Sequence, residues 1–117
     1  MIFHLDTSTS QPVGIVLLKA RIDATNSSEL QKAFTNWLQQ TRNFVFDCKE
    51  LDFIDSSGLG TIVSCLRKAL EHQGDLKLAA LGPKVAMVFE LTKAKKLFSI
   101  FSDSSEAIQS FGTVCQQ

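Results

Sequence analysis

No stretch of the 117-residue sequence stays apolar over the length of about 20 residues that a membrane-spanning helix needs. The segment Met1–Asp6 contains no basic region, and its apolar run is too short for a signal peptide. The sequence therefore predicts neither a membrane span nor an export signal, and we expect a cytoplasmic protein.

An excess of one sign of charge is also missing, because 12 lysines and arginines offset 12 aspartates and glutamates. The one basic cluster is short and consists of Lys93, Lys95 and Lys96. A nucleic-acid-binding protein normally has a basic face or stripe. We therefore expect no direct contact with nucleic acid.

Cysteine is scarce and its spacing has no pattern. The 3 cysteines, Cys48, Cys65 and Cys115, are odd in number, lie far apart and form no CxxC or histidine-paired motif. Such spacing favours neither a disulfide framework nor a zinc site, and it suits a reducing cytoplasm. A length of 117 residues fits one domain, residues 1–117, which is large enough to bury a core without disulfides or a structural metal.

Strand and helix patterns alternate along the chain. The predicted strands are Ile2–Asp6, Val13–Leu18, Phe44–Phe46, Leu76–Leu81 and Leu97–Phe101, and the predicted helices begin near Thr25–Glu29, Ser56, Pro83 and Ser102–Glu106. Alternation of this kind is typical of α/β layers. Because the chain opens with a hairpin-like pair, we predict a mixed, mostly parallel sheet with an antiparallel N-terminal edge strand and about four helices.

The first helix should bury an apolar stripe that includes Phe34 and Trp37, because these residues recur at helical spacing. Asn26 and Glu29 have the spacing of a capping box at its start. Further along, Gly74 stands where the second helix should end in a left-handed turn.

The second helix follows a short buried strand, Phe44–Phe46, and the polar segment Lys49–Asp52, which has the composition of a turn. From Leu59 to Leu70, apolar residues recur at helical spacing. We therefore expect one face of this helix, Leu70 included, to be buried.

Two serines stand at the start of this second helix. The first turn of a helix has unpaired N–H groups and a partial positive charge, and an Asp or Ser side chain caps it. Of the residues Asp55, Ser56 and Ser57, we expect Ser56 to cap the helix and Ser57 to project, open to modification. Taken alone, these residues are equally compatible with a simple capped turn.

Asp23 follows the second strand, and sites in open α/β sheets are built at the carboxyl ends of strands. Asp23 is therefore a candidate neighbour of Ser57.

The sequence around these residues does not match the motifs that two enzymatic or phosphate-accepting roles would need. A hydrolase nucleophile at Ser57, activated by His4 or His72, would need the G-x-S-x-G elbow, but Asp55 occupies the first glycine position. A phosphate-accepting receiver domain would need an acidic pair after its first strand, and Arg21–Asp23 supplies only one acid. We therefore expect no catalytic residues.

The sequence gives equally little support for a metal or cofactor site. Asp52 and Asp55 could bind magnesium, but no third carboxylate stands at a fixed spacing, and both fit a turn or a helix start. Gly58-Leu59-Gly60 lacks the third glycine of a dinucleotide loop, and no G-K-[ST] motif occurs. We expect neither a metal nor a cofactor.

The run Leu51–Val63, LDFIDSSGLGTIV, resembles the signature of the anti-sigma factor antagonists, whose fold is the STAS domain. The resemblance extends to Arg21–Ala24, Leu76–Pro83 and Val88–Phe98, in the family's order and over nearly the whole chain. In this family a partner serine kinase phosphorylates the second serine of D-S-S-G, and that serine corresponds to Ser57.

The resemblance implies a bacterial partner-switching protein that regulates transcription indirectly. Its unphosphorylated form would bind a serine kinase that is also an anti-sigma factor, and so release the sigma factor. Phosphorylation of Ser57 would then dissociate the complex, and a PP2C-like phosphatase would reset it. The expected partner-binding residues are Asp23, Asp55, Ser56, Gly58, Leu59 and Thr61. The protein is expected to be a monomer or a weak dimer.

One alternative from a different class stays open. The same surface could belong to a scaffold or regulatory subunit that binds a signalling or transport partner without any sigma factor. The chain also departs from the family pattern at Lys93, where typical members have a glycine that ends the third helix. Because lysine is strained in a left-handed turn, we expect this helix to run on toward Lys96.

Overall fold

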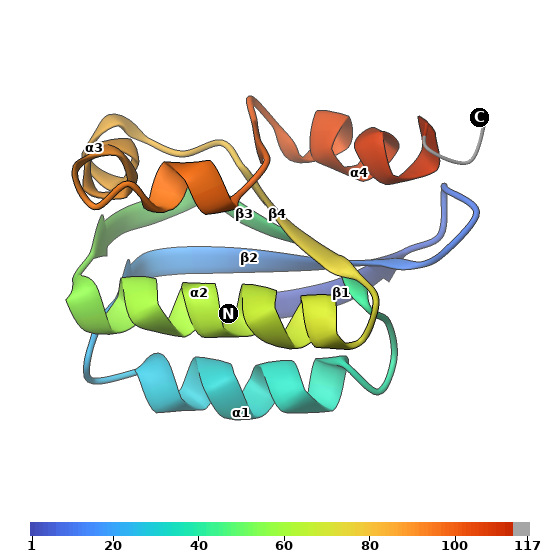
Figure 1. Ribbon diagram of the computed structural model, residues 1–117, viewed down its shortest axis with the longest axis horizontal. Coiled ribbons are helices and arrows are strands. Elements are labelled where there is room, and N and C mark those ends of the chain that lie inside the picture. Colours follow the sequence, from blue (N-terminus) through green and yellow to red (C-terminus); the bar gives the residue numbers. More distant parts are fainter. Residues whose placement is uncertain (114–117) are drawn as a thin grey trace.

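The structure is a computed structural model that describes residues 1–113; Cys115 lies outside them. A five-stranded sheet with the order β1-β2-β3-β4-β5 runs through the molecule (Figure 1). Its strands are β1 (Ile2–Asp6), β2 (Val13–Ile22), β3 (Asn43–Ile54), β4 (Asp75–Ala79) and β5 (Ile100–Phe101). β1 is antiparallel to β2 and every other pairing is parallel, which confirms the predicted fold class.

Helices cover both faces of the sheet. They are α1 (Ser27–Trp37), α2 (Ser56–Glu71), α3 (Pro83–Leu91) and α4 (Ser104–Thr113), with a 3₁₀ helix, η1 (Ala94–Leu97), after α3. Figure 1 shows α1 and α2 side by side on one face, α4 on the opposite face, and α3 with η1 near the carboxyl end of β3. In residues 1–113, no helix is both long and apolar enough to cross a bilayer.

Aromatic residues form the centre of the core between α1 and the sheet. Phe34, Phe44 and Phe46 are each 0% exposed, and the ring centroid of Phe34 lies 4.5 Å from that of Phe44. The predicted inward face of α1 is therefore confirmed at Phe34. Trp37 is only half-buried and stacks on Phe3 of the edge strand, with ring centroids 4.9 Å apart.

β3 is much longer than its Phe44–Phe46 core, and the predicted polar turn at Lys49–Asp52 is wrong. These residues continue the strand, with Glu50 paired to Lys19 and Ile54 paired to Ile22. The ladder continues because β2 itself extends to Ile22 and supplies backbone partners. Lys49, Glu50 and Asp52 stay exposed while Leu51 and Ile54 are buried, so the polar residues occupy the solvent-exposed positions of a strand.

At two helix ends, the predicted residues do not have the predicted roles. Asn26 makes no side-chain cap for α1; its Oδ1 instead accepts a hydrogen bond from Asp23 N at 2.9 Å, so no capping box forms. After α2, the left-handed residue is Gln73, with φ 65°, and not Gly74. Gly74 serves close approach, because a Cβ there would lie 1.8 Å from the backbone oxygen of Arg42.

Two further predictions about helices α2 and α3 are wrong. Leu70 is 54% exposed, because the buried stripe of α2 continues from Ile62 through Leu66 to Ala69, and Leu70 lies beside this stripe. α3 ends at Leu91 and does not run on, since Lys93 adopts the left-handed conformation at φ 63° and η1 begins directly after it. The packing of Ala94 and Phe98 into the core holds the chain in this turn.

Candidate functional site

The site is built at the start of α2, where the chain leaves β3. Asp55 is the N-cap of the helix, and its Oδ1 accepts a hydrogen bond from Gly58 N at 2.8 Å. The expectation that Ser56 would be the cap is therefore wrong. A carboxylate is favoured here because it also meets the partial positive charge of the helix end. Ser56 and Ser57 are both exposed.

Gly58 lets the first turn of α2 lie against the end of β2. A Cβ at Gly58 would be 2.1 Å from the backbone oxygen of Ile22, far inside any tolerable contact. The same oxygen accepts a hydrogen bond from Asp55 N at 3.4 Å. The ends of β2 and β3 and the start of α2 are therefore held together at the backbone, which brings the predicted site segments to one place.

Asp23 lies in a tight turn directly after β2 and is 7% exposed. Its Oδ1 accepts hydrogen bonds from the hydroxyl of Thr25 at 2.5 Å and from Thr25 N at 3.0 Å. These bonds, with a smaller contribution from Arg21 at 3.5 Å, hold the pKa of the Asp23 carboxyl below its ordinary value. The carboxylate therefore shapes the turn beside α2 and keeps its charge.

The other predicted contact residues are mostly inside the fold. Gly58 and Leu59 are buried, and Thr61 is 3% exposed, with its hydroxyl accepting a hydrogen bond from Gln31 Nε2 at 3.4 Å. Their placement suits them to position the exposed residues of the site. Ser56 and Ser57 stand on the surface above them.

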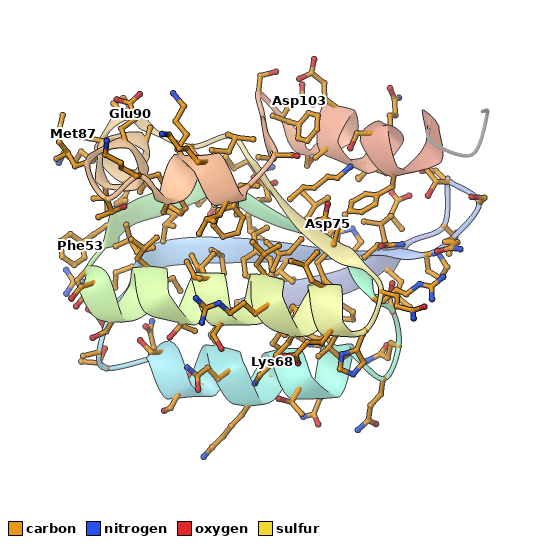
Figure 2. All side chains as sticks on the ribbon, viewed as in Figure 1. Phe53, Lys68, Asp75, Met87, Glu90 and Asp103 are labelled. Atoms are coloured by element: carbon orange, nitrogen blue, oxygen red, sulfur yellow. The ribbon has the colours of Figure 1, made fainter. Side chains whose placement is uncertain are left out.

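Sequence reasoning missed two exposed residues at this end of the sheet. Phe53 is 47% exposed and stands at the outer end of β3 (Figure 2), and the guanidinium carbon of Arg21 lies 5.6 Å from its ring centroid. A large exposed aromatic with a cation against it is a common feature of contact surfaces. Alternation from the buried Leu51 would place Phe53 inside, so no local signal finds it; a register shift in the pairing of β2 with β3 breaks the alternation here.

The histidines stand away from Ser57. His72 follows the last turn of α2, about 22 Å from Ser57 along the helix at 1.5 Å per residue. His4 lies in β1 and is exposed. Neither arrangement provides a base beside Ser57.

The described part of the chain contains no group of three potential metal-ligating side chains. Cys48 and Cys65 are buried, and burial raises the pKa of each thiol to about 12.

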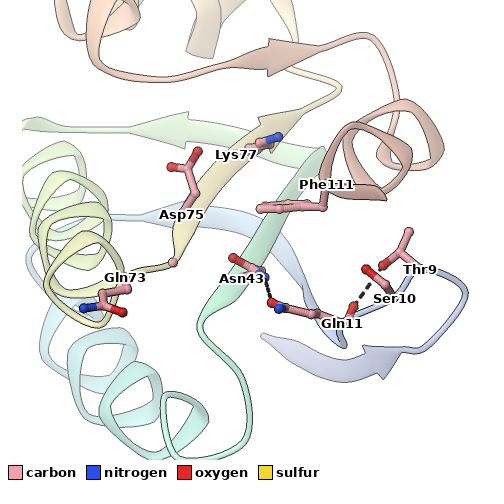
Figure 3. Close-up of a pocket in the computed structure, with 9 residues that line it drawn as sticks. Thr9, Ser10, Gln11, Asn43, Gln73, Asp75, Lys77 and Phe111 are labelled. Atoms are coloured by element: carbon pink, nitrogen blue, oxygen red, sulfur yellow. Dashed lines mark hydrogen bonds between the residues drawn. The ribbon is translucent and has the colours of Figure 1, made fainter. Parts of the chain in front are cut away.

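A cavity of about 330 Å³ lies at the opposite end of the sheet, where β3 and β4 begin (Figure 3). Lys77 is its one lysine, and the amine donates to the hydroxyl of Ser110 at 2.6 Å and lies 4.0 Å from the ring centroid of Phe111. Desolvation lowers the pKa of Lys77. These contacts tie α4 to the sheet, so we assign Lys77 a structural role.

A sequence model of the STAS domain matches residues 4–107. The chain belongs to the STAS domain family. BtrV of Bordetella bronchiseptica, whose name proposes it as an anti-sigma factor antagonist, is 27% identical to this STAS domain over 100 residues, which cover 85% of this chain and 86% of BtrV. The anti-sigma-B factor antagonist of Staphylococcus aureus (strain NCTC 8325 / PS 47) is 24% identical over 101 residues, which cover 86% of this chain and 94% of that protein.

Solved structures have the same fold. A Thermotoga maritima protein, crystallised as a candidate anti-sigma factor antagonist, superposes with a TM-score of 0.83 at 22% identity and covers 93% of this chain and 92% of its own. SpoIIAA of Bacillus in its phosphorylated form superposes with a TM-score of 0.70 at 20% identity, covering 94% of this chain and 99% of its own. At these identities the likeness shows the fold alone.

Proposed function

We propose that this STAS domain is a non-catalytic anti-sigma factor antagonist that switches partners through phosphorylation of Ser57. Unphosphorylated, it binds a serine kinase that is also an anti-sigma factor, and the sigma factor is released. The kinase then phosphorylates Ser57 and the complex dissociates. A PP2C-like phosphatase removes the phosphate, so that the cytoplasmic cycle begins again.

The exposed hydroxyl of Ser57 is the observation that carries this proposal. Asp55 already caps α2, so the hydroxyl of Ser57 is not needed to satisfy the helix end. Ser57 is exposed, while Gly58 and Leu59 directly after it are buried. A kinase can therefore reach this hydroxyl. The relatives named as anti-sigma factor antagonists support the same role.

A phosphate at Ser57 acts on docking more than on folding. It adds about −1.5 to −2 charges at pH 7. The start of α2 attracts this charge by about 0.3–1 kcal/mol at an exposed position, while the Asp55 carboxylate next to it repels it. At a closed interface the phosphate must also lose its water against a surface shaped for a hydroxyl, which costs several kcal/mol.

The test begins with the partner. Ser57→Ala, purified from its native cell, should retain a serine kinase, because this variant cannot take the phosphate that causes release. Mass spectrometry of the parent protein after incubation with that kinase and ATP should place the phosphate on Ser57. Ser56→Ala is the matched control and should be phosphorylated normally. Phosphate on Ser56, or on both serines equally, would overturn the assignment.

Binding of the purified kinase then measures the charge effect. Ser57→Asp should bind about 100-fold more weakly than Ser57→Ala if the interface penalty is about 3 kcal/mol. The circular dichroism spectrum and melting temperature of both variants should stay near those of the parent. Equal binding by the two folded variants would contradict the mechanism. A retained partner that is not a kinase, with no sigma-factor output, would favour the scaffold role instead.

A further inference from the structure

A groove of about 490 Å³ runs beside the phosphoacceptor segment, between α2 and η1. On α2 its wall is a single helical stripe of Ser56, Gly60, Val63 and Arg67. The opposite wall is the turn from Thr92 to Ala94 together with Leu97. In Figure 1, η1 lies alongside the first half of α2, so the groove opens at the same end of the helix as Ser57.

The charge in the groove is entirely positive. Arg67 and Lys93 stand on its two walls, and no carboxylate lines it. In residues 1–113 neither cation takes part in a salt bridge; Glu90, the acid on the neighbouring helix, pairs with Lys95 at 3.4 Å. The whole chain has a formal net charge of +0, so this is a local concentration of cations.

Lys93 occupies its place at a conformational cost. Its φ of 63° lies in the left-handed region, where glycine is favoured and a side chain is strained. The side-chain amine of Lys93 makes no hydrogen bond or ion pair within residues 1–113, so it is available to a partner.

The groove also has apolar side chains on both walls. Leu97 is 56% exposed, Val63 is half-buried and Leu59 is 9% exposed at the floor. Cations and apolar side chains on both walls are complementary to a segment that carries carboxylates on both sides of one or two apolar side chains. The concave shape fits the side chains of a polypeptide better than it fits a flat lipid surface.

We infer that this groove binds an acidic amphipathic segment of the partner protein, with Arg67 and Lys93 as the residues that select it. This inference rests on the proposed function in taking that partner to be the kinase that phosphorylates Ser57. It also specifies how release works. Ser56 lines the groove, so a phosphate on Ser57 adds negative charge beside an already acidic occupant and competes with it for the same cations.

The test uses a fluorescein-labelled ten-residue peptide of glutamate and leucine, with a glutamine and leucine peptide as its neutral counterpart. The full ¹⁵N-labelled chain should bind the acidic peptide, with amide shifts concentrated at Gly60, Val63, Arg67 and Lys93. Lys93→Glu and Arg67→Glu should each weaken this binding at least tenfold. Lys32→Glu, an equal charge change at an exposed position of α1, is the matched control and should bind like the parent.

Lys93→Gly separates a binding role from a structural one. It removes the strain, so the melting temperature should rise, and it removes one cation, so peptide binding should weaken threefold or more. Equal binding of the acidic and neutral peptides, shifts confined to another surface, or stronger binding to phosphatidylglycerol vesicles than to the peptide would each overturn the inference.

Failure of this inference is distinguishable from failure of the proposed function. If Ser57→Asp blocks kinase binding while Lys93→Glu and Arg67→Glu bind kinase and peptide like the parent, the groove has no such role and the switch at Ser57 stands. If the groove variants lose the kinase while Ser57→Asp binds it as well as Ser57→Ala, the groove stands and the phosphorylation switch is wrong.

Discussion

Gly58 and Gly60 lie two residues apart on α2 and should respond to the same substitution with opposite signs. In Gly58→Ala the new Cβ would stand 2.1 Å from the backbone oxygen and 2.7 Å from the backbone carbon of Ile22. Backbone atoms cannot rotate away, so α2 or β2 must shift. At Gly60 a Cβ would meet no atom within 4 Å.

The magnitudes follow from three contributions. Overpacking at Gly58 costs about 1–3 kcal/mol, and weakening the hydrogen bond from Asp55 N to Ile22 O costs about 0.5–1.5 kcal/mol. Alanine in a helix gains about 1 kcal/mol over glycine. Gly58→Ala should therefore lose about 0.5–3.5 kcal/mol of unfolding free energy, by the sum of these ranges. Gly60→Ala should gain up to about 1 kcal/mol.

Urea unfolding followed by circular dichroism and by Trp37 fluorescence measures both variants. One kcal/mol corresponds to roughly 4 °C in melting temperature for a domain of this size. A Gly58→Ala variant as stable as Gly60→Ala would refute the reasoning, because the close approach of α2 to Ile22 would then not constrain the helix. Equal destabilisation by both changes would also refute it, since open space at Gly60 cannot produce strain.

Two further predictions test the core and the turn beside the site. Phe34→Ala should cost about 3–5 kcal/mol in urea unfolding, because the ring is 0% exposed and its removal leaves a cavity; a loss within experimental error would mean that α1 packs differently. The lowered pKa of Asp23 stabilises the fold above the ordinary carboxyl value of 3.8, and this contribution is lost as pH falls through the folded-state value. Asp23→Asn should therefore be less stable than the parent at pH 7, and the difference should shrink below pH 3.8. Asp52→Asn, at an exposed position of β3, is the control; a pH-independent difference for Asp23→Asn would contradict the account.

Much of the fold was predictable from local pattern. The apolar runs of β2 and β4, the helical stripe with Phe34 and the proline at the start of α3 each determine a local conformation, because period and propensity act within one element. The position of the α2 start was predictable for the same reason. Asp55, Ser56 and Ser57 stand at a change from strand to helix, and the unpaired N–H groups at any helix start demand a cap.

Tertiary structure decided what depends on a neighbour in space. The polar segment Lys49–Asp52 forms part of a strand because β2 pairs with it along its backbone. Gly58 and Gly74 proved to be needed for contact with Ile22 and Arg42, which lie far away in sequence, and not for a turn. Lys93 was forced into a left-handed turn by the burial of the residues after it. The groove between α2 and η1 exists only because these distant segments meet, and no local pattern could place Arg67 opposite Lys93.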